Sequence, residues 1–329
     1  MTTVDRPAGG PVEAHGPSGL RPLQVGIALG SGSARGWAHI GIMRALAEQG
    51  IRPDVVAGAS IGSLVGAAYA SGQLEALEAW ALGLSRVDVW KLLDTTIRRG
   101  GVMSGNRLMR AVREHVTDHA IQDLPVPFAA VATELDTGVE VWLREGSMLD
   151  AVRASSGIPG MFTPSWYQDR WLIDGGVVNP VPVSTCRALG ADYVIAINLN
   201  KHLQAFTGRR RYPPPPDDPE FVHEEESEEE GRAGLERLTG LVHGLVDSFK
   251  AARGVEPGLF DVVGASIAIM QDRITRSRMV GDPPDVVIEP DIADFELLDF
   301  HRAGEAISLG RDAVERVDEE LQDLQQALP

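Results

Sequence analysis

Residues 54–62 read DVVAGASIG, an apolar run that stops abruptly at Gly-Ala-Ser-Ile-Gly. The two valines predict a buried strand, and the small residues at 63–70 predict a helix. Ser60 is therefore expected at a strand-to-helix turn, which exposes its hydroxyl near a helix N-terminus that favours negative charge. Gly58 and Gly62 leave room for that geometry. On this stretch alone, Ser60 is either a nucleophile or a small residue in a tight turn.

The chain before this stretch predicts a parallel α/β opening. A strand at 23–29 is followed by the glycine-rich loop GSGSARG at 30–36 and a helix ending near Gln49. Backbone N–H groups of such a loop can bind an anion, either a dinucleotide phosphate or the oxyanion of an acyl-transfer intermediate. Arg35 occupies the third glycine position of the dinucleotide pattern, and no acidic residue ends the next strand. An oxyanion loop beside Ser60 is the favoured interpretation.

The middle of the chain predicts a hairpin and two further strands. Residues 73–117 are expected to be mostly helical, and the later elements are PFAAVATEL (127–135) paired with VEVWLREG (139–146), a short helix in SMLDAVRASSGIPGMFTP (147–164), a strand in WLIDGGVVNPVPV (171–183) and the strand ADYVIAINL (191–199).

A serine nucleophile needs a base within hydrogen-bond reach. None of the eight histidines falls in a glycine-marked turn; His39, for example, is expected to be a packing or surface residue of the first helix. Asp174 does fall in such a turn, because a strand delivers it to Gly175 and Gly176. An isolated Asp-Gly-Gly is usually a hairpin turn. Beside an oxyanion loop and a serine turn, however, Asp174 becomes the candidate base, already ionised at neutral pH.

Composition excludes several classes of function. The formal charge of −17 opposes nucleic-acid binding and electrostatic attraction to anionic lipid, so any membrane contact must be apolar. Cys186 is the only cysteine, which excludes an intrachain disulfide and a thiolate metal cluster and fits a reducing compartment. No apolar run approaches the length of a membrane span.

The later part of the chain contains a low-complexity segment. Residues 201–233 hold four successive prolines and the acidic run EEESEEE, and predict a solvated insertion. Residues 235–249 carry an apolar stripe at helical spacing, expected either to pack on the domain or to form a lipid-contacting lid. A helix over 259–279, the strand DVVIEP and a charged helix follow. Ser266 lies in GASIA, a near copy of GASIG, and is expected to be a small packing residue in mid-helix.

The motifs GSGSARG, GASIG and DGG, in this order, resemble those of the patatin-like phospholipase family, particularly its bacterial members similar to the catalytic domain of neuropathy target esterase. The segments VATELDTG, AVRASSGIPGMFTP and PPDVVIEP also resemble the pattern of that family. The resemblance spans roughly residues 23–316. It implies a three-layer α/β/α domain with a mostly parallel central sheet. Outside it would lie a disordered leader at 1–22 and a tail at 317–329, and the motif-bearing part would be 23–200.

The resemblance also implies an activity. Ser60 matches the nucleophile and Asp174 the base of a catalytic dyad that cleaves fatty acyl esters of phospholipids or lysophospholipids, with neither a metal ion nor a cofactor. The oxyanion and motif positions matched are Gly30, Ser31, Gly32, Ser33, Arg35 and Gly36, supported by Gly58, Gly62, Gly175 and Gly176. The expected partners are a lipid or lysolipid substrate and, transiently, a membrane surface, but no nucleic acid. The expected location is cytoplasmic or peripheral on the membrane.

Two alternatives stay open at this stage. An ordinary α/β-hydrolase would combine Ser60 and Asp174 with His202 or His301 in a triad. A lipid-binding or adaptor protein would keep the fold with weak or no turnover.

Overall fold

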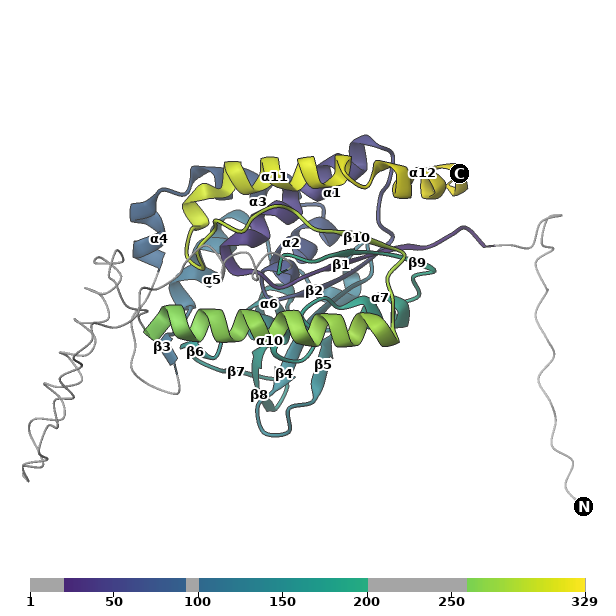
Figure 1. Ribbon diagram of the computed structural model, residues 1–329. Helices are drawn as coiled ribbons and strands as arrows, with labels where there is room; N and C mark the ends of the chain where they lie inside the picture. Colours follow the sequence, from purple (N-terminus) through teal and green to yellow (C-terminus); the bar gives the residue numbers. More distant parts are fainter. Residues whose placement is uncertain (1–20, 93–100, 201–258, 329) are drawn as a thin grey trace, which may run out of the picture.

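The computed structural model describes residues 21–92, 101–200 and 259–328, and its centre is an eight-stranded sheet flanked by helices (Figure 1). The strands lie in the order β10-β9-β1-β2-β4-β8-β7, with β5 also paired to β4. The strands are β1 (Val25–Leu29), β2 (Val55–Ala59), β3 (Gly101–Met103), β4 (Phe128–Glu134), β5 (Glu140–Leu143), β6 (Gly160–Phe162), β7 (Ser165–Tyr167), β8 (Arg170–Asp174), β9 (Tyr193–Ile197) and β10 (Val286–Ile288). The α-helices are α1 (Ala38–Glu48), α2 (Ile61–Ala70), α3 (Leu74–Gly83), α4 (Arg86–Leu92), α5 (Asn106–His115), α6 (Met148–Ser155), α7 (Val183–Ala188), α10 (Leu259–Gly281), α11 (Ala303–Glu315) and α12 (Asp318–Ala327). Short 3₁₀ turns occur at η1 (Ser33–Trp37), η2 (Ile121–Asp123), η3 (Gly175–Val177) and η4 (Phe300–Arg302).

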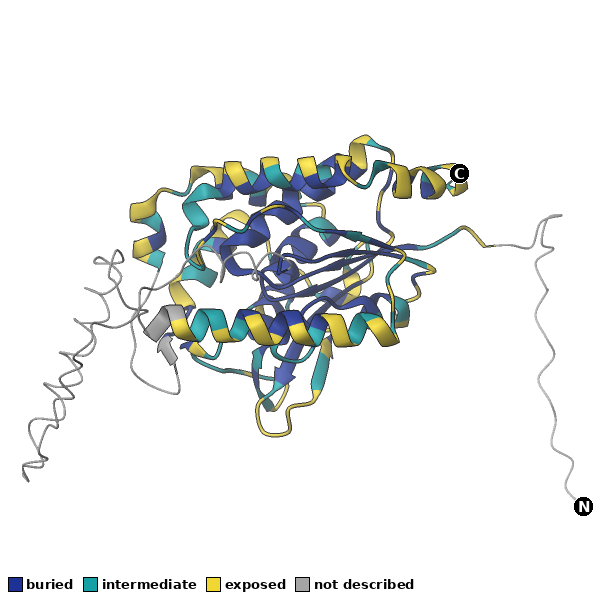
Figure 2. Cartoon of the chain, in the orientation of Figure 1, coloured by how far each residue is buried: buried dark blue, intermediate teal, exposed yellow. Residues whose placement is uncertain are grey.

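The central strands of the sheet are parallel, as the sequence predicts. β10, β9, β1, β2 and β4 run in one direction, and β1 lies between β2 and β9. Strands in the middle of a parallel sheet are covered on both faces, which requires continuous apolar runs. All five residues of β1 and of β2 are accordingly buried (Figure 2).

Alternate side chains of the strands enter two separate cores. Val25, Ile27 and Leu29 of β1 belong to the larger core, which α1, α2 and α11 complete. Ala28 belongs to a smaller core on the opposite face, where α7 packs against β1, β2 and β9. Successive side chains of a strand point to opposite faces, so the sheet lies between two helical layers. The predicted three-layer α/β/α architecture is therefore confirmed.

Two strands end against each other beside β4. β2 pairs in parallel with Phe128–Val131 of β4, and β8 pairs antiparallel with the next three residues, Ala132 to Glu134. β5 pairs with residues 130–133 and overlaps both partners, so it must occupy the other edge of β4. β2 and β8 thus share one edge and approach it from opposite directions. Their carboxyl ends meet head to head.

The structure differs from the sequence interpretation in several places, and strands β6 and β7 were not predicted. Within 73–117 the sequence predicted mostly helix, whereas β3 pairs with β6 in a two-stranded sheet. Ser266 lies in α10 as expected, but it is exposed and not a packing residue. The predicted tail includes α12, whose Leu321 and Leu324 are buried in the larger core. A short helix, α7, was missed. The predictions for the leader, apart from residues 21 and 22, and those for 201–233 and 235–249 lie outside the described residues.

Helices α1 and α11 pack at backbone distance, and two glycines make this possible. A Cβ atom at Gly41 of α1 would lie 1.9 Å from the carbonyl oxygen of Ile307, and one at Gly310 of α11 would lie 2.2 Å from that of Ala38. Non-bonded atoms cannot approach so closely, so either side chain would separate the helices. This contact fixes α11, near the C-terminal end of the chain, on α1.

We expect Gly41→Ala to destabilise the protein by about 1–3 kcal/mol, because the added methyl group forces the two helices apart. Gly83→Ala is the matched control, since a Cβ at this glycine in the last position of α3 would meet no atom within 4 Å. The control should change stability by less than about 1 kcal/mol. Denaturant unfolding followed by circular dichroism measures both, and equal losses would contradict the tight contact.

Candidate active site

The ends of β2 and β8 bring Ser60 and Asp174 together. Ser60 follows the last residue of β2, Asp174 is the last residue of β8, and both side chains are buried. The Ser60 hydroxyl donates a hydrogen bond to Asp174 Oδ2 at 2.7 Å. Two residues 114 positions apart in the chain thus touch, as the sequence interpretation requires.

The backbone at Ser60 is a sharp turn in a conformation that few residues adopt. Its φ of 55° and ψ of −125° lift the side chain away from the sheet before α2 begins at Ile61. A Cβ atom at Gly58 would lie 2.4 Å from the carbonyl oxygen of Gly62, and a Cβ at Gly62 would lie 2.2 Å from that of Leu29. Both glycines of the Gly-x-Ser-x-Gly motif are therefore required by close backbone packing around the turn.

Ser155, at the end of α6, holds the Ser60 turn through two hydrogen bonds of its hydroxyl. Its hydroxyl accepts a hydrogen bond from Ser60 N at 2.9 Å and donates one to the carbonyl oxygen of Val131 at 2.6 Å. Val131 is the residue of β4 at which β2 stops. Ser155 therefore ties the Ser60 turn to the junction of the two strands. The Ser60 N–H is fully engaged in this bridge.

Asp174 is held by hydrogen bonds on each side. Oδ1 accepts from Gly176 N at 2.7 Å, and the main-chain carbonyl accepts from the Thr133 hydroxyl at 2.8 Å. A Cβ at Gly175 would lie 2.0 Å from the Val131 carbonyl oxygen, so only glycine fits there. Burial raises the pKa of the Asp174 carboxyl to about 6, against the opposing effect of the bonds from Ser60 and Gly176. The carboxylate is thus a stronger base than an exposed aspartate.

The glycine-rich loop lies beside this pair, but its N–H groups are not equivalent. Gly30 N donates to Ile197 O and Ser31 N donates to Pro180 O, so these two predicted oxyanion donors are already engaged. Within the described ranges, the N–H groups of Gly32 and Ser33 donate to no protein acceptor. Ser33 shares the lining of one pocket with Ser60. The donors available to an anion are therefore Gly32 and Ser33.

Arg35 orients one of these donors. Its Nε donates to the Gly32 carbonyl oxygen at 3.1 Å, and its backbone N donates to the same oxygen at 3.2 Å. That carbonyl belongs to the same planar peptide unit as Ser33 N–H, so fixing the oxygen fixes the N–H in the opposite direction. Burial lowers the pKa of Arg35 only to about 10, so a positive charge polarises this peptide at neutral pH.

His39 bonds to the main chain at the start of the loop. Its ring is fully buried in α1, and Nε2 lies 2.7 Å from the Gly30 carbonyl oxygen. Burial lowers the pKa of His39 to about 4, so the imidazole is neutral and its Nε2–H donates to that carbonyl. The sequence interpretation gave His39 no such role. The only available signal was its position three residues beyond the glycine loop.

The far end of the chain also holds this loop. The Leu297 carbonyl oxygen, between β10 and η4, accepts from the Ser33 hydroxyl at 2.6 Å and from Ala34 N at 3.3 Å. Trp37 Nε1 donates to the Phe300 carbonyl oxygen at 3.1 Å. The loop and the turn that follows it are therefore held by residues more than 260 positions downstream in the sequence.

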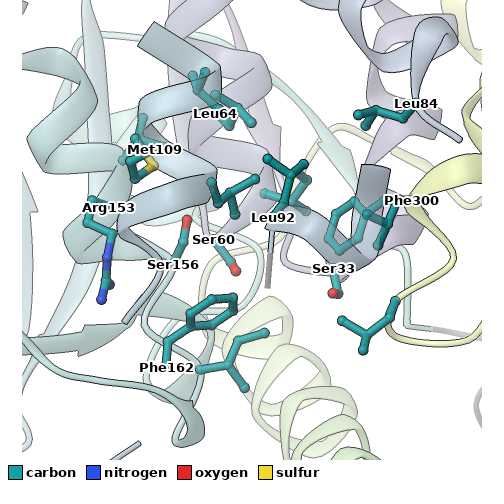
Figure 3. Close-up of a pocket in the computed structure, with 18 of the residues that line it drawn as sticks. Ser33, Ser60, Leu64, Leu84, Leu92, Met109, Arg153, Ser156, Phe162 and Phe300 are labelled. Atoms are coloured by element: carbon teal, nitrogen blue, oxygen red, sulfur yellow. The ribbon is translucent and has the colours of Figure 1, made fainter. Parts of the chain in front are cut away.

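A largely apolar pocket opens onto Ser60 (Figure 3). The open space among its lining residues is about 930 Å³, a volume that includes bulk solvent at the mouth. Apolar side chains from α2, α4 and α5 and from the segment after β10 make up most of its wall; among them are Leu64, Leu84, Leu92, Met109, Phe162 and Phe300. Its polar side chains are those of Ser33, Ser60, Arg153 and Ser156. A hydrocarbon chain is the kind of ligand that such a wall accepts.

Of the two histidines of the triad alternative, His301 is described, and its ring bonds to Arg86. His301 Nε2 accepts a hydrogen bond from Arg86 Nε at 2.9 Å, and burial, followed by the nearby Arg86 charge, lowers its pKa. His202 lies outside the described residues. Over the same described ranges, no group of three or more His, Cys, Asp or Glu side chains could hold a metal ion. No described helix is long and apolar enough to cross a membrane.

Comparisons with known proteins show what the chain is similar to. The family profile described as Patatin-like phospholipase matches residues 27–187. The chain is 33% identical to the NTE family protein Rv1063c of Mycobacterium tuberculosis, over 93% of each chain. It is 34% identical to the human patatin-like phospholipase domain-containing protein 6, over 53% of this chain and 13% of that protein. The crystal structure of VipD from Legionella pneumophila superposes with a TM-score of 0.49 at 13% identity, covering 91% of this chain and 67% of that one.

The profile and the near full-length relative together define the class. The chain belongs to the patatin-like phospholipase family, whose members as a class are lipid acyl hydrolases. Within that family it is similar to the proteins named for the NTE family.

We expect Ser155→Ala to lower the free energy of unfolding by about 1–3 kcal/mol, because it leaves the buried N–H of Ser60 without an acceptor. Ser71→Ala is the control. The Ser71 hydroxyl donates to carbonyls at the C-terminus of α2 and accepts from Gln73 Nε2, which also donates to the Thr117 carbonyl oxygen. Water can replace the hydroxyl at this half-buried position, so its loss should cost less than about 1 kcal/mol. Denaturant titration gives both values. A Ser155 variant as stable as the native protein would contradict the bridge.

Proposed function

We propose that this protein is a serine acyl hydrolase that cleaves fatty acyl esters of lipids, with Ser60 as nucleophile and Asp174 as base. The observation that carries the proposal is the 2.7 Å hydrogen bond from the Ser60 hydroxyl to the buried Asp174 carboxylate. A nucleophile bonded directly to its base needs no third residue to transfer the proton. The family of the chain supports the same reaction class.

In the first half of the proposed reaction, Ser60 Oγ attacks the acyl carbonyl carbon and the hydroxyl proton passes to Asp174 Oδ2. The carbonyl oxygen becomes an oxyanion, which accepts hydrogen bonds from Gly32 N–H and Ser33 N–H. Donors held rigid before the reaction stabilise the developing charge without reorganisation. When the carbon–oxygen bond to the leaving group breaks, Asp174 returns the proton to the departing alcohol.

The second half releases the fatty acid. Asp174, again ionised, takes a proton from a water molecule that attacks the acyl-Ser60 ester. The second tetrahedral intermediate uses the same two N–H donors. Its collapse breaks the bond to Ser60 Oγ, and the proton on Asp174 returns to the serine. Every proton taken by Asp174 is given back within one turnover.

The pocket supports a fatty acyl group as the part of the substrate that binds. Most of its lining residues are apolar, and its polar side chains are limited to Ser33, Ser60, Arg153 and Ser156. Burying each methylene of an acyl chain contributes about 0.8 kcal/mol. A phospholipid or lysophospholipid meets these requirements. Binding without turnover is the second candidate function, since an apolar pocket alone would also hold a lipid.

We expect the native protein to release free fatty acid from defined phospholipids or lysophospholipids over many turnovers. Ser60→Ala and Asp174→Asn should each lower kcat by at least about a thousandfold, because each removes a group that forms or breaks a bond. Product release is followed by mass spectrometry, and circular dichroism confirms that the variants are folded.

A panel in which lipid is retained but less than one equivalent is hydrolysed would favour the binding alternative. Turnover that survives the Ser60 substitution would reject Ser60 as the nucleophile. His301→Asn is the matched control, and it should leave kcat within about twofold of the native value, because His301 bonds to Arg86 and not to Ser60.

We also expect activity to fall at acid pH with a midpoint near 6. Asp174 acts as a base only when ionised, and burial raises its pKa to about 6, so kcat/KM should fall about tenfold for each pH unit below that value. The measurement uses a soluble short-chain ester, which avoids effects of pH on lipid vesicles. A midpoint at 3.8, the ordinary value for aspartate, would show that the carboxyl is not perturbed as the structure requires.

A further inference from the structure

Helix α10 places one polar side chain against the active site. Gln271, near the middle of this helix, is only 6% exposed, and its Nε2 donates to the Ser31 hydroxyl oxygen at 3.1 Å. Its Oε1 accepts from Asn200 Nδ2, also at 3.1 Å. Both ends of the amide are therefore bonded, and one of them is bonded to the glycine-rich loop. Figure 1 shows α10 crossing in front of the sheet.

The Gln271 amide also lies against the Asp174 turn. A Cβ atom at Gly176 would lie 2.3 Å from Gln271 Nε2, 2.8 Å from Ser31 Oγ and 2.9 Å from Asp174 Oδ1. Three polar groups from three parts of the chain thus converge on the position that a side chain at residue 176 would occupy. Glycine at this position leaves the space that Gln271 fills. The amide stands between the glycine loop and the turn that carries Asp174.

The hydrogen bond between Gln271 and Asn200 also affects the peptide unit that carries Gly32 N–H. Asn200 Nδ2, held by Gln271, also lies 3.5 Å from the Ser31 carbonyl oxygen, a long hydrogen bond. That oxygen belongs to the same planar peptide unit as Gly32 N–H. Arg35 fixes the peptide that carries Ser33 N–H, and the pair of Gln271 and Asn200 fixes the peptide that carries Gly32 N–H.

We propose that Gln271 is a positioning residue that holds the glycine loop through Ser31 and Asn200, so that Gly32 N–H points at the oxyanion. The proposal rests on the proposed function, because it concerns the same reaction. Gln271 does not touch the substrate carbonyl itself. It lies outside the 27–187 segment that the family profile matches, so a helix far along the chain completes the site.

The alternative is that Gln271 is simply a buried amide that packs the helix. Thr275 offers the comparison, because it lies one turn further on the same helix and is 2% exposed. Within the described residues, its hydroxyl has no hydrogen-bond partner. A residue that merely fills the helix interface should behave like Thr275 on substitution.

The test compares Gln271→Met with Thr275→Val, each of which keeps the side-chain volume and removes polar atoms. With a soluble short-chain ester, we expect Gln271→Met to lower kcat about tenfold with KM within about twofold, since the effect is on transition-state donors and not on substrate binding. Thr275→Val should leave kcat within about twofold. An unchanged kcat in Gln271→Met, or an equal loss in Thr275→Val, would overturn the proposal.

A double-mutant cycle with Ser31→Ala tests the route of the effect. If Gln271 acts through Ser31, the double variant should lose no more kcat than the worse single variant, because both remove the same contact. Losses that multiply would mean that the two residues act independently, and would overturn the proposal.

Gln271→Glu supplies a readout that packing alone would not move. No neighbouring charge contributes to the pKa shift of Asp174. A carboxylate at position 271 places a negative charge beside Asp174, so we expect the acid limb of kcat/KM to move up by about one pH unit. A limb that does not move would place the residue 271 side chain away from Asp174 and overturn the proposal.

Failure of the proposed function is distinguished by a measurement that needs no turnover. The melting temperatures of Gln271→Met, Ser31→Ala and the double variant form a second cycle. If the native protein shows no Ser60-dependent hydrolysis, the proposed function fails and this cycle decides. If the double variant lowers the melting temperature by less than the sum of the two single variants, the result supports the contact between Gln271 and Ser31. Strictly additive decreases in melting temperature overturn the proposal.

Discussion

The structure depends on the meeting of two strand ends at one edge of β4. β2 stops beside Val131 and β8 stops beside Ala132, and the two strands approach from opposite directions. In a uniformly parallel sheet, all strands would end at the same end of the sheet, and two strands that both pair with β4 would have β4 between them. The reversal of β8 lets an aspartate face a serine with no strand in the way. The register of one central strand therefore sets the distance between the two reacting groups.

The surroundings of this junction show why it is packed so closely. Ser155 and Thr133 saturate the main-chain groups at the strand ends, and Gly175 lies directly over the Val131 carbonyl. Closing the junction to water raises the pKa of Asp174 and makes it a better proton acceptor. The same closure disfavours the ionised form of Asp174 that the proposed reaction uses. Hydrogen bonds from Ser60 and Gly176 offset part of that cost.

The sequence predicted those parts of the site that have a local signature. Ser60 and Asp174 each lie at a strand end marked by glycines, and the loop at 30–36 follows a strand, so all three could be found by inspection. Gly30 and Ser31 were predicted as donors, but their N–H groups bond to Ile197 and Pro180, contacts that no local pattern encodes.

The remaining parts of the site have no such signature. Three of these residues lie in ordinary helical stretches: Ser155, His39 and Gln271. Each gains its role only from a tertiary contact, which the local sequence does not encode. The same difference between local and tertiary signals explains which parts of the fold could be predicted. The parallel heart of the sheet follows from apolar runs, whereas the reversed β8 and the β3–β6 pair depend on three-residue pairings too short to leave a periodic signal.

The carbonyl of Leu297 bonds to the glycine loop and is encoded far downstream of it. A ribosome makes the polypeptide from its amino end, so the serine and the aspartate emerge long before Leu297 does. During translation, the nascent polypeptide carries both reacting groups but lacks the downstream atoms that shape the loop. The site around Ser60 and Asp174 therefore stays incomplete until synthesis has passed the codon for Leu297.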